Sequence, residues 1–211
     1  MRITEIFFSI QGESTYAGRP CVFVRLTGCP LRCAWCDTTY AFDGGTERSL
    51  ESVLNEVEQY GCRLVEITGG EPLTQSEASP LITALADRGH TVLLETSGAL
   101  DLTPVDPRTV VIMDLKCPGS GMVDRNRWAN LSLLKPMDEI KFVVKDRTDY
   151  DWAITIVREH GLTARHTVLF SPVFGEMDPQ ALAEWILADR LPVRFQLQLH
   201  KHVWDPVTRG V

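Results

Sequence analysis

The sequence predicts an α/β fold, a parallel β/α barrel of the TIM type that is incomplete and partly open. Two observations favour this fold. Between residues 21 and 97, short apolar segments alternate with segments of helical periodicity, an order typical of parallel strands joined by right-handed crossovers. After residue 99 the predicted strands follow one another too closely for several crossover helices, so we expect the barrel to lack them.

The individual elements follow from residue type and periodicity. Strands are expected at residues 3–10, 21–26, 63–67, 91–95, 109–115, 139–144, 166–170 and 193–199. Helices are expected at residues 49–60, from an N-cap at Ser79, near 150–160 and from Asp178, with at most a short helix around Trp128. In the helix at 49–60, apolar residues recur at helical spacing and Gly61 marks the end.

Length and composition indicate one globular domain covering residues 1–211. Within it we distinguish an N-terminal strand and loop (1–20), a cysteine-rich loop (28–38) and a C-terminal tail (198–211). The formal net charge of −7 disfavours binding to a phosphate backbone, so we expect no nucleic-acid partner. No apolar run is long enough to span a membrane, and residues 1–5 do not resemble a signal peptide. We therefore expect a cytoplasmic protein without a membrane partner.

Three cysteines lie within eight residues: Cys29, Cys33 and Cys36, in the spacing Cys-x3-Cys-x2-Cys. Thiolates this close can hold an iron–sulfur cluster. Since a cubane cluster has four irons, three protein ligands leave one iron open, much as a catalytic zinc keeps one position open. The alternatives are a zinc site completed by a distant histidine and reduced cysteines in the core. A disulfide framework is less favoured for clustered thiols in a cytosolic protein.

Arg25 stands near the end of the second predicted strand, on the face opposite Val22, Val24 and Leu26. A buried guanidinium needs an anionic partner. The residues alone leave two possibilities open: a structural ion pair, for example with Glu66, or an anionic ligand.

Polar residues gather at the carboxyl ends of the predicted strands. They are Thr27, Thr68, Glu71, Ser97, Asp114, Lys116, Ser171 and His200. In parallel barrels this rim carries the chemistry, and the cysteine-rich loop leaves the first barrel strand at the same rim. We therefore expect the functional site there.

The cysteine spacing is that of the radical S-adenosylmethionine (radical SAM) enzymes, and further motifs accompany it. They are Phe8-Ser9-Ile10-Gln11-Gly12-Glu13, Cys36-Asp37-Thr38, Thr68-Gly69-Gly70-Glu71-Pro72, Gln198-Leu199-His200-Lys201 and Arg209-Gly210-Val211. Over nearly its whole length the chain resembles the 7-carboxy-7-deazaguanine synthases, a radical SAM family of the queuosine and 7-deazapurine pathway. The resemblance implies the radical SAM form of the incomplete barrel.

The same resemblance implies a carbon–nitrogen lyase. Its reaction would convert 6-carboxy-5,6,7,8-tetrahydropterin into 7-carboxy-7-deazaguanine and ammonia by a radical, Mg-assisted ring contraction. The implied cofactors are a [4Fe–4S] cluster, S-adenosylmethionine (SAM), which yields a 5′-deoxyadenosyl radical, and Mg²⁺. The implied partners are the pterin substrate, an external electron donor of the flavodoxin or ferredoxin type, and a second subunit in a homodimer.

Residue roles carried over from the family fall into four groups. The cluster ligands would be Cys29, Cys33 and Cys36. The SAM-binding residues would be Trp35, Cys36, Asp37, Gly70, Asp114, Leu115, Lys116, Ser171, Pro172, Val173 and Phe174. The substrate-binding residues would be Ile10, Gln11, Gly12, Arg25 and Thr68, with Glu13 and His200 as further candidates. Thr38 would bind Mg²⁺, completed by substrate oxygens and water. A pterin carboxylate would give Arg25 the anion that it needs.

Two other functions must be separated from this one. A glycyl-radical activase shares the cysteine spacing and the Gly-Gly-Glu-Pro segment but would dock a protein. The Gln-Gly-Glu segment and the inward Arg25 favour a small acidic heterocycle instead. A small iron–sulfur electron-transfer module or a zinc-binding module would need a fourth protein ligand, and would leave Gly69-Gly70-Glu71 without a role.

Overall fold

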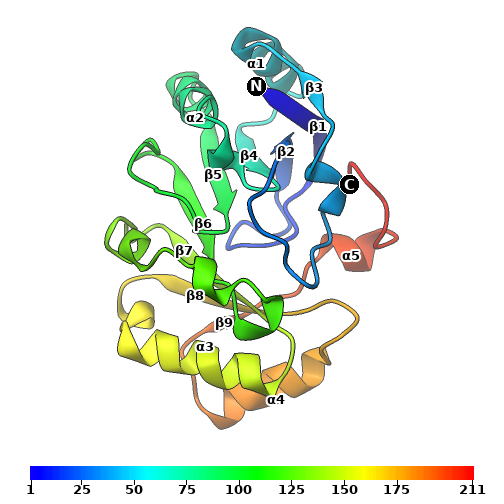
Figure 1. Cartoon of the computed structure of the whole chain (residues 1–211). Coiled ribbons are helices and arrows are strands. Elements are labelled where there is room, and N and C mark those ends of the chain that lie inside the picture. The colour runs from blue at the N-terminus through cyan, green and yellow to red at the C-terminus, as the bar shows by residue number, and fades with distance from the viewer.

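The computed structural model describes residues 1–211, and its centre is one nine-stranded sheet curved into an open barrel (Figure 1). The strands are β1 (Arg2–Ile10), β2 (Pro20–Leu26), β3 (Thr46–Glu47), β4 (Leu64–Gly69), β5 (Thr91–Thr96), β6 (Val110–Asp114), β7 (Glu139–Val144), β8 (Thr167–Pro172) and β9 (Arg194–Phe195). Their order in the sheet is β3-β1-β2-β4-β5-β6-β7-β8-β9. All neighbours from β2 to β9 pair in parallel, whereas β1 and β3 are antiparallel additions at one edge. The predicted fold class is confirmed.

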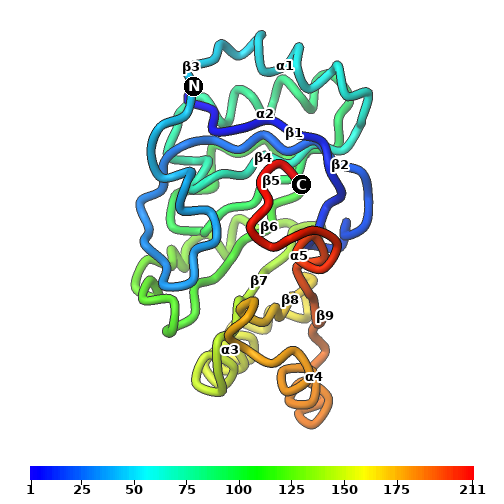
Figure 2. Tube along the Cα trace, turned by 90° about the vertical axis from the view of Figure 1, so that its right-hand side faces the viewer, coloured from blue at the N-terminus to red at the C-terminus, as the bar shows by residue number.

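The helices cover the outside of the barrel unevenly. The α-helices are α1 (Leu50–Gln59), α2 (Ala78–Asp87), α3 (Arg147–Glu159), α4 (Pro179–Ala188) and α5 (His200–Val203). In Figure 1 and Figure 2, α1 and α2 lie outside the first strands and α3 and α4 outside the last ones. Only short 3-10 helices stand between β6 and β7, and no helix joins β5 to β6. None of the helices is both long enough and apolar enough to cross a membrane.

The two faces of β2 serve different purposes. Val22, Val24 and Leu26 are fully buried in the main core, where they pack with residues of α1 such as Val53. Arg25 lies on the other face and lines the interior of the barrel. The strand alternation predicted from the sequence is confirmed, and it separates the core from the site.

Two helix starts differ from the sequence prediction. Residue Ser79 lies inside α2, and Glu77 occupies the N-cap position, so the prediction that Ser79 caps this helix is wrong. Helix α3 begins at Arg147, before the predicted start near residue 150. The side chain of Asp146 caps it by accepting hydrogen bonds from backbone N–H groups of the first turn.

Strand β9 is much shorter than the predicted strand 193–199. Beyond it the side chain of Gln196 exchanges two hydrogen bonds with the backbone of Ser14, at 2.9 and 2.8 Å. The N–H of Leu199 donates to the carbonyl of Gly12 at 2.9 Å. These residues therefore join the loop 11–19 across the open side of the barrel instead of extending the sheet.

Candidate active site

One large cavity of about 810 Å³ occupies the mouth and interior of the barrel. Its wall brings together the loop after β1, the cysteine-rich loop, the ends of β4, β5 and β6, and the C-terminal tail. The three clustered cysteines, Cys29, Cys33 and Cys36, all line it. The cavity therefore includes the rim at which the order of strands predicted the site.

Backbone contacts hold the cysteine-rich loop in place beside the barrel. The N–H of Gly28 donates to the carbonyl of Ala41 at 2.8 Å, and the N–H of Ala34 donates to the carbonyl of Ser120 at 3.0 Å. Its three cysteines are free and half-buried, and burial raises the pKa of each thiol. Metal binding has to displace these protons, because the thiolate is the ligand.

The donor set of this loop fits a cubane cluster. No three His, Cys, Asp or Glu side chains converge closely enough to hold a single metal ion. A cubane attaches its cysteines to separate irons, so it needs thiolates that stand further apart than the ligands of one ion. Cys21, Cys62 and Cys117 do not line the cavity. A cubane cluster bound here would therefore have three thiolates from the protein, Cys29, Cys33 and Cys36, and one iron left to a non-protein ligand.

Gly69 and Gly70 bring the end of β4 directly against the cysteine-rich loop. A Cβ atom on Gly70 would overlap the carbonyl oxygen of Gly28 and lie 2.7 Å from the Cβ of Cys29. A Cβ atom on Gly69 would overlap the carbonyl oxygen of Leu26. Only glycine permits these approaches, so Gly70 is required for the packing of the cysteine-rich loop and Gly69 for the packing of β4 against the end of β2.

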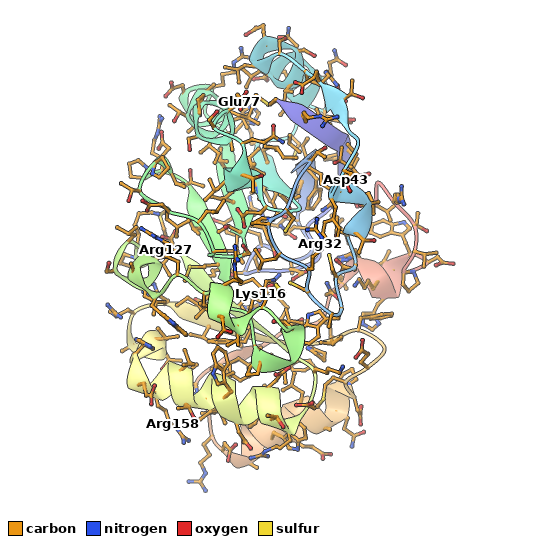
Figure 3. All side chains as sticks on the ribbon, viewed as in Figure 1. Arg32, Asp43, Glu77, Lys116, Arg127 and Arg158 are labelled. Atoms are coloured by element: carbon orange, nitrogen blue, oxygen red, sulfur yellow. The ribbon has the colours of Figure 1, made fainter.

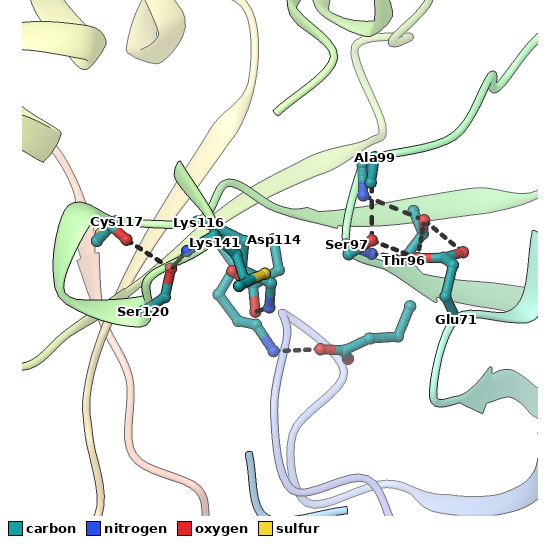
Figure 4. A network of polar contacts seen from close by, with 12 residues as sticks. Glu71, Thr96, Ser97, Ala99, Asp114, Lys116, Cys117, Ser120 and Lys141 are labelled. Carbon is teal, nitrogen blue, oxygen red and sulfur yellow. Dashed lines mark hydrogen bonds and ion pairs between the residues drawn. The ribbon is translucent and has the colours of Figure 1, made fainter. Parts of the chain in front are cut away.

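Glu71 fixes the turn that carries these glycines to the end of β5. Its carboxylate is fully buried and accepts hydrogen bonds from the N–H of Leu73, the hydroxyl of Thr96, and both the N–H and the hydroxyl of Ser97 (Figure 4). The bonds from Ser97 measure 2.7 and 2.6 Å. Because this network ties the turn after β4 to the end of β5, the two neighbouring strands together fix the position of Gly70.

Unpaired buried oxygens lie where the resemblance placed SAM. Asp114 Oδ1 at the end of β6 and Ser171 Oγ on β8 are buried without a hydrogen-bond partner. The other oxygen of Asp114 binds Lys116 Nζ at 2.8 Å (Figure 4), and Lys116, labelled in Figure 3, also lines the cavity. Because an unsatisfied buried acceptor is costly, the free oxygen of Asp114, which lines the cavity, fits a cofactor that brings an ammonium or hydroxyl group, as SAM does, whereas Ser171 Oγ lies behind the wall.

Most of the residues predicted from the resemblance lie on the cavity wall. The SAM candidates that line it are Trp35, Cys36, Asp37, Gly70, Asp114, Lys116, Val173 and Phe174. The substrate candidates that line it are Ile10, Gln11, Gly12, Glu13, Arg25, Thr68 and His200, and Thr38 lines it as well.

Three SAM candidates lie outside this wall. Leu115 is fully buried in the core, because strand alternation turns it away from the face of Asp114 and Lys116. Ser171 lies behind the wall with 1% of its surface exposed, and Pro172 lines a smaller neighbouring cavity.

The loop after β1 reaches the cavity from the end opposite to the cysteines. Since β1 runs antiparallel to β2, Ile10 pairs with Pro20 at the amino end of β2. The following loop therefore lies beneath the barrel, and Gln11 and Glu13 line the cavity from there. A Cβ atom on Gly12 would overlap the ring of His200, so glycine lets this loop lie against α5.

Four charged residues and one amide form the floor of the cavity. Lys141 Nζ binds Glu13 Oε2 at 2.8 Å and also binds Glu95, while the amide of Gln11 donates to Glu66.

The three carboxyl groups of the floor differ in how readily they hold a proton. Burial raises the pKa of Glu95 to about 7. Burial, with the nearby acidic groups, also raises the pKa of Glu66 well above its usual value. For Glu13 the same effect of burial is outweighed by Lys141 and other polar neighbours, so its pKa falls to about 2. The floor thus holds one firmly ionised carboxylate beside two carboxyl groups that retain protons readily.

Arg25 pairs with Glu5, not with Glu66. Its Nε lies 2.7 Å from Glu5 Oε1, which also accepts a hydrogen bond from the hydroxyl of Tyr40 at 2.8 Å. The suggested Arg25–Glu66 pair is wrong because the antiparallel strand β1 places Glu5 directly opposite Arg25 in the register. Glu66 binds Gln11 instead.

The C-terminal tail is tied to the cysteine-rich loop through Asp37. One oxygen of Asp37 accepts a hydrogen bond from Lys201 Nζ at 2.6 Å, and the other accepts from the hydroxyl of Thr38 at 2.9 Å. Lys201 and these hydrogen bonds lower the pKa of the carboxyl group of Asp37, whose side chain is 47% exposed. The tail therefore closes one side of the cavity.

Sequence reasoning did not assign Glu95, Lys141 or Tyr40 to the site. Glu95 and Lys141 lie within otherwise apolar strands, and a charged residue in such a strand is a signal that could have found them. Tyr40 follows the cysteines in an irregular segment, so nothing in the local pattern marks it.

Comparisons with known proteins agree with this geometry. Residues 23–186 match the model of the Radical SAM superfamily. The chain is 50% identical to the 7-carboxy-7-deazaguanine synthase of Chlorobaculum tepidum, over all of the chain and 97% of the relative. It is 49% identical to that of Koribacter versatilis, over the full length of both. The crystal structure of QueE from Escherichia coli superposes with a TM-score of 0.77 at 26% identity, covering 94% of each chain.

The two relatives match the chain over the cysteine-rich loop, the floor and the tail together, and they favour neither an activase nor a small metal-binding module. The chain belongs to the radical SAM superfamily and, within it, to the family of 7-carboxy-7-deazaguanine synthases.

Proposed function

We propose that this radical SAM enzyme converts 6-carboxy-5,6,7,8-tetrahydropterin into 7-carboxy-7-deazaguanine with release of ammonia. The product is the one in the names of its relatives. One observation carries the substrate: a single cavity joins the cysteine triad at its mouth to a polar floor that is buried in the barrel. Such a floor suits a small heterocycle with donors and acceptors along its edge.

The floor offers groups that complement the pyrimidine edge of a pterin. The ionised carboxylate of Glu13 accepts hydrogen bonds, as paired ring and exocyclic N–H donors require. Lys141 and Gln11 supply donors for a ring carbonyl oxygen. In this arrangement Glu13 and Lys141 bind and orient the heterocycle, while the protonated form of Glu95 can donate a hydrogen bond of its own.

Arg25 suits the carboxylate of the same substrate. Its bond to Glu5 uses Nε alone, so the two terminal nitrogens have no protein acceptor. A planar guanidinium donates in parallel to the two oxygens of a carboxylate. Thr68, paired beside Arg25 in the register of β2 and β4, adds a hydroxyl next to this position.

The residues of the cavity mouth would hold the cofactors. Cys29, Cys33 and Cys36 would ligate a [4Fe–4S] cluster, and the cavity-lining SAM candidates, with Asp114 and Gly70 among them, would bind SAM. When bound, these groups supply a 5′-deoxyadenosyl radical. The chain itself contributes orientation of the substrate and exclusion of water, since the tail and the cysteine-rich loop close over the cavity.

The proposal also covers the metal ion, the electron donor and the subunit arrangement. Thr38 offers one neutral oxygen to the cavity, which suits Mg²⁺ that keeps substrate oxygens and water as its other ligands. A flavodoxin or ferredoxin would deliver electrons in the cytoplasm. A homodimer would cover the outer edge of β1, which β3 pairs only at Arg2 and Ile3. The whole chain would act as one domain.

The test is anaerobic reconstitution followed by incubation with reductant, SAM, Mg²⁺ and the carboxylated tetrahydropterin. We expect 7-carboxy-7-deazaguanine and ammonia in amounts that exceed 5′-deoxyadenosine, because loss of ammonia from this substrate is redox-neutral and needs no net consumption of SAM. Free formation of 5′-deoxyadenosine without the deazaguanine would reject the substrate while leaving the superfamily in place.

A further inference from the structure

The segment 206–211 forms part of the cavity wall. In Figure 1 the C-terminus lies beside the blue segment that contains η1 (Thr39–Ala41), and Figure 2 shows the red tail crossing the open side of the barrel. The guanidinium carbon of Arg209 stands 4.0 Å from the centre of the Tyr40 ring. This places a cation of the tail at the same end of the cavity as Arg25.

Arg209 differs from every other lysine and arginine of the wall. The other four are each paired with a carboxylate: Arg25 with Glu5, Lys116 with Asp114, Lys141 with Glu13 and Glu95, and Lys201 with Asp37. No acidic group lies within ion-pair distance of Arg209. It is therefore the one wall cation whose charge the protein leaves uncompensated.

This difference matters for the carboxylate of the substrate. Glu5 already balances the charge of Arg25, and the hydroxyl of Tyr40 donates to the same oxygen of Glu5. A ligand carboxylate bound by Arg25 alone would leave this end of the cavity with an excess negative charge. Arg209 supplies the missing positive charge, since Arg25 and Arg209 share the ring of Tyr40, with guanidinium carbons 5.8 and 4.0 Å from its centre.

Stacking also leaves Arg209 ready to bind. A guanidinium that lies over an aromatic face keeps its N–H donors in its own plane, directed away from the ring. Tyr40 thus orients the side chain without using its hydrogen-bonding capacity. The combination of a position against the ring of Tyr40, free donors and no ion-pair partner is that of a carboxylate-binding group.

We propose that Arg209 is a specificity-determining residue that, together with Arg25, binds the carboxylate of the substrate. The inference rests on the proposed function and deepens it. It assigns part of the discrimination between acidic and neutral pterins to the tail, in addition to the contribution of Arg25 in the barrel.

The test measures ligand binding without turnover. Reconstituted protein with SAM and Mg²⁺, but without reductant, is titrated anaerobically with 6-carboxytetrahydropterin and with its neutral 6-carboxamide. We expect Arg209→Met to weaken binding of the acid roughly 10- to 100-fold, the effect of losing a charge-assisted contact, and to leave binding of the amide unchanged. Arg209→Lys should recover part of the loss, because it restores the charge without the planar fork.

Arg19 provides a matched control. It also stacks on a tyrosine, Tyr16 at 5.1 Å, but does not line the cavity, so Arg19→Met should bind both ligands as the wild type does. Equal loss of acid and amide binding in Arg209→Met would show that the tail only packs, and unchanged acid binding would also overturn the inference. If the wild type binds neither pterin, the proposed function fails together with it. If the wild type binds the acid and Arg209→Met does so equally well, only the role of Arg209 fails.

Discussion

Replacement of Glu71 by glutamine tests whether the glycine turn is held by its buried carboxylate. In the wild type one oxygen of Glu71 accepts from both the N–H and the hydroxyl of Ser97, and the other accepts from Leu73 and Thr96. Glutamine keeps one acceptor and turns the other position into an NH₂ donor. If that NH₂ faces Ser97, the hydroxyl of Ser97 can rotate to accept from it, but the backbone N–H of Ser97 cannot.

The expected loss in the free energy of unfolding follows from the hydrogen bonds that Glu71 accepts. An orphaned buried donor costs ~1–3 kcal/mol, and each remaining bond loses part of the ~1.5–3 kcal/mol that a hydrogen bond to a charged group contributes. Because Glu71 is fully buried, solvent cannot replace the lost acceptor. Together these terms predict a destabilisation of about 3 kcal/mol, which corresponds to a fall in melting temperature of roughly 6–12 °C for a chain of this size.

Urea unfolding of the metal-free protein, followed by circular dichroism, measures this free energy directly. Glu77→Gln is the matched control, since Glu77 lies close by in the chain with a side chain that is 52% exposed. We expect that variant to stay within about 0.5 kcal/mol of the wild type. The reasoning would be refuted by a Glu71→Gln variant as stable as the control, because the buried N–H of Ser97 would then have found another partner.

Two further predictions concern the cysteine-rich loop and the floor. Gly70→Ala places a Cβ against Gly28 and Cys29, so we expect strain of roughly 1–3 kcal/mol to displace the cysteine-rich loop and iron and sulfide per chain to fall after reconstitution. Gly18→Ala meets no atom within 4 Å, and its backbone strain, from a φ of +87°, lies outside the cysteine-rich loop, so this variant should retain iron and sulfide. Full iron content in Gly70→Ala would contradict the prediction. Burial raises the pKa of Glu95 from 4.5 to about 7, so the folded chain holds a proton that the unfolded chain has lost in this interval, and this group's contribution to stability is present at low pH and lost as pH rises from 4.5 to about 7. The stability of Glu95→Gln relative to the wild type should therefore increase across that range in urea unfolding, and a constant difference between the two would show that Glu95 is not protonated there.

Much of the fold could be predicted because local patterns and burial agree along most of the chain. The alternation of β2 separates Val24 from Arg25 in the sequence as it does in the structure, and the short connections after residue 99 do lack crossover helices. Ser79 shows the limit of such reasoning. A serine before a proline is a good local signal for a helix start, yet α2 already begins at Ala78, whose buried side chain packs in the core.

The sequence predicted where the site lies better than it predicted which side chains pair with one another there. The cysteine spacing and the Gly-Gly-Glu segment are local in the sequence, so their grouping at the rim followed from the order of the strands. The partner of Arg25 did not, because it depends on the antiparallel register that sets Glu5 beside it. The same holds for Lys141, which meets Glu13 across 128 residues of chain.

The short β9 explains why the floor can be polar at all. A regular strand through residue 199 would direct alternate side chains away from the cavity and commit its backbone to a neighbour in the sheet. Instead, Gln196 holds Ser14, a non-glycine residue at φ +63°, and the amide of Gln198 donates to Glu13 at 3.0 Å. Side-chain contacts thus take the place of a ladder between strands. The loop that closes the open barrel is therefore also the loop that presents Glu13 to the cavity, so closure of the barrel and formation of the floor depend on the same contacts.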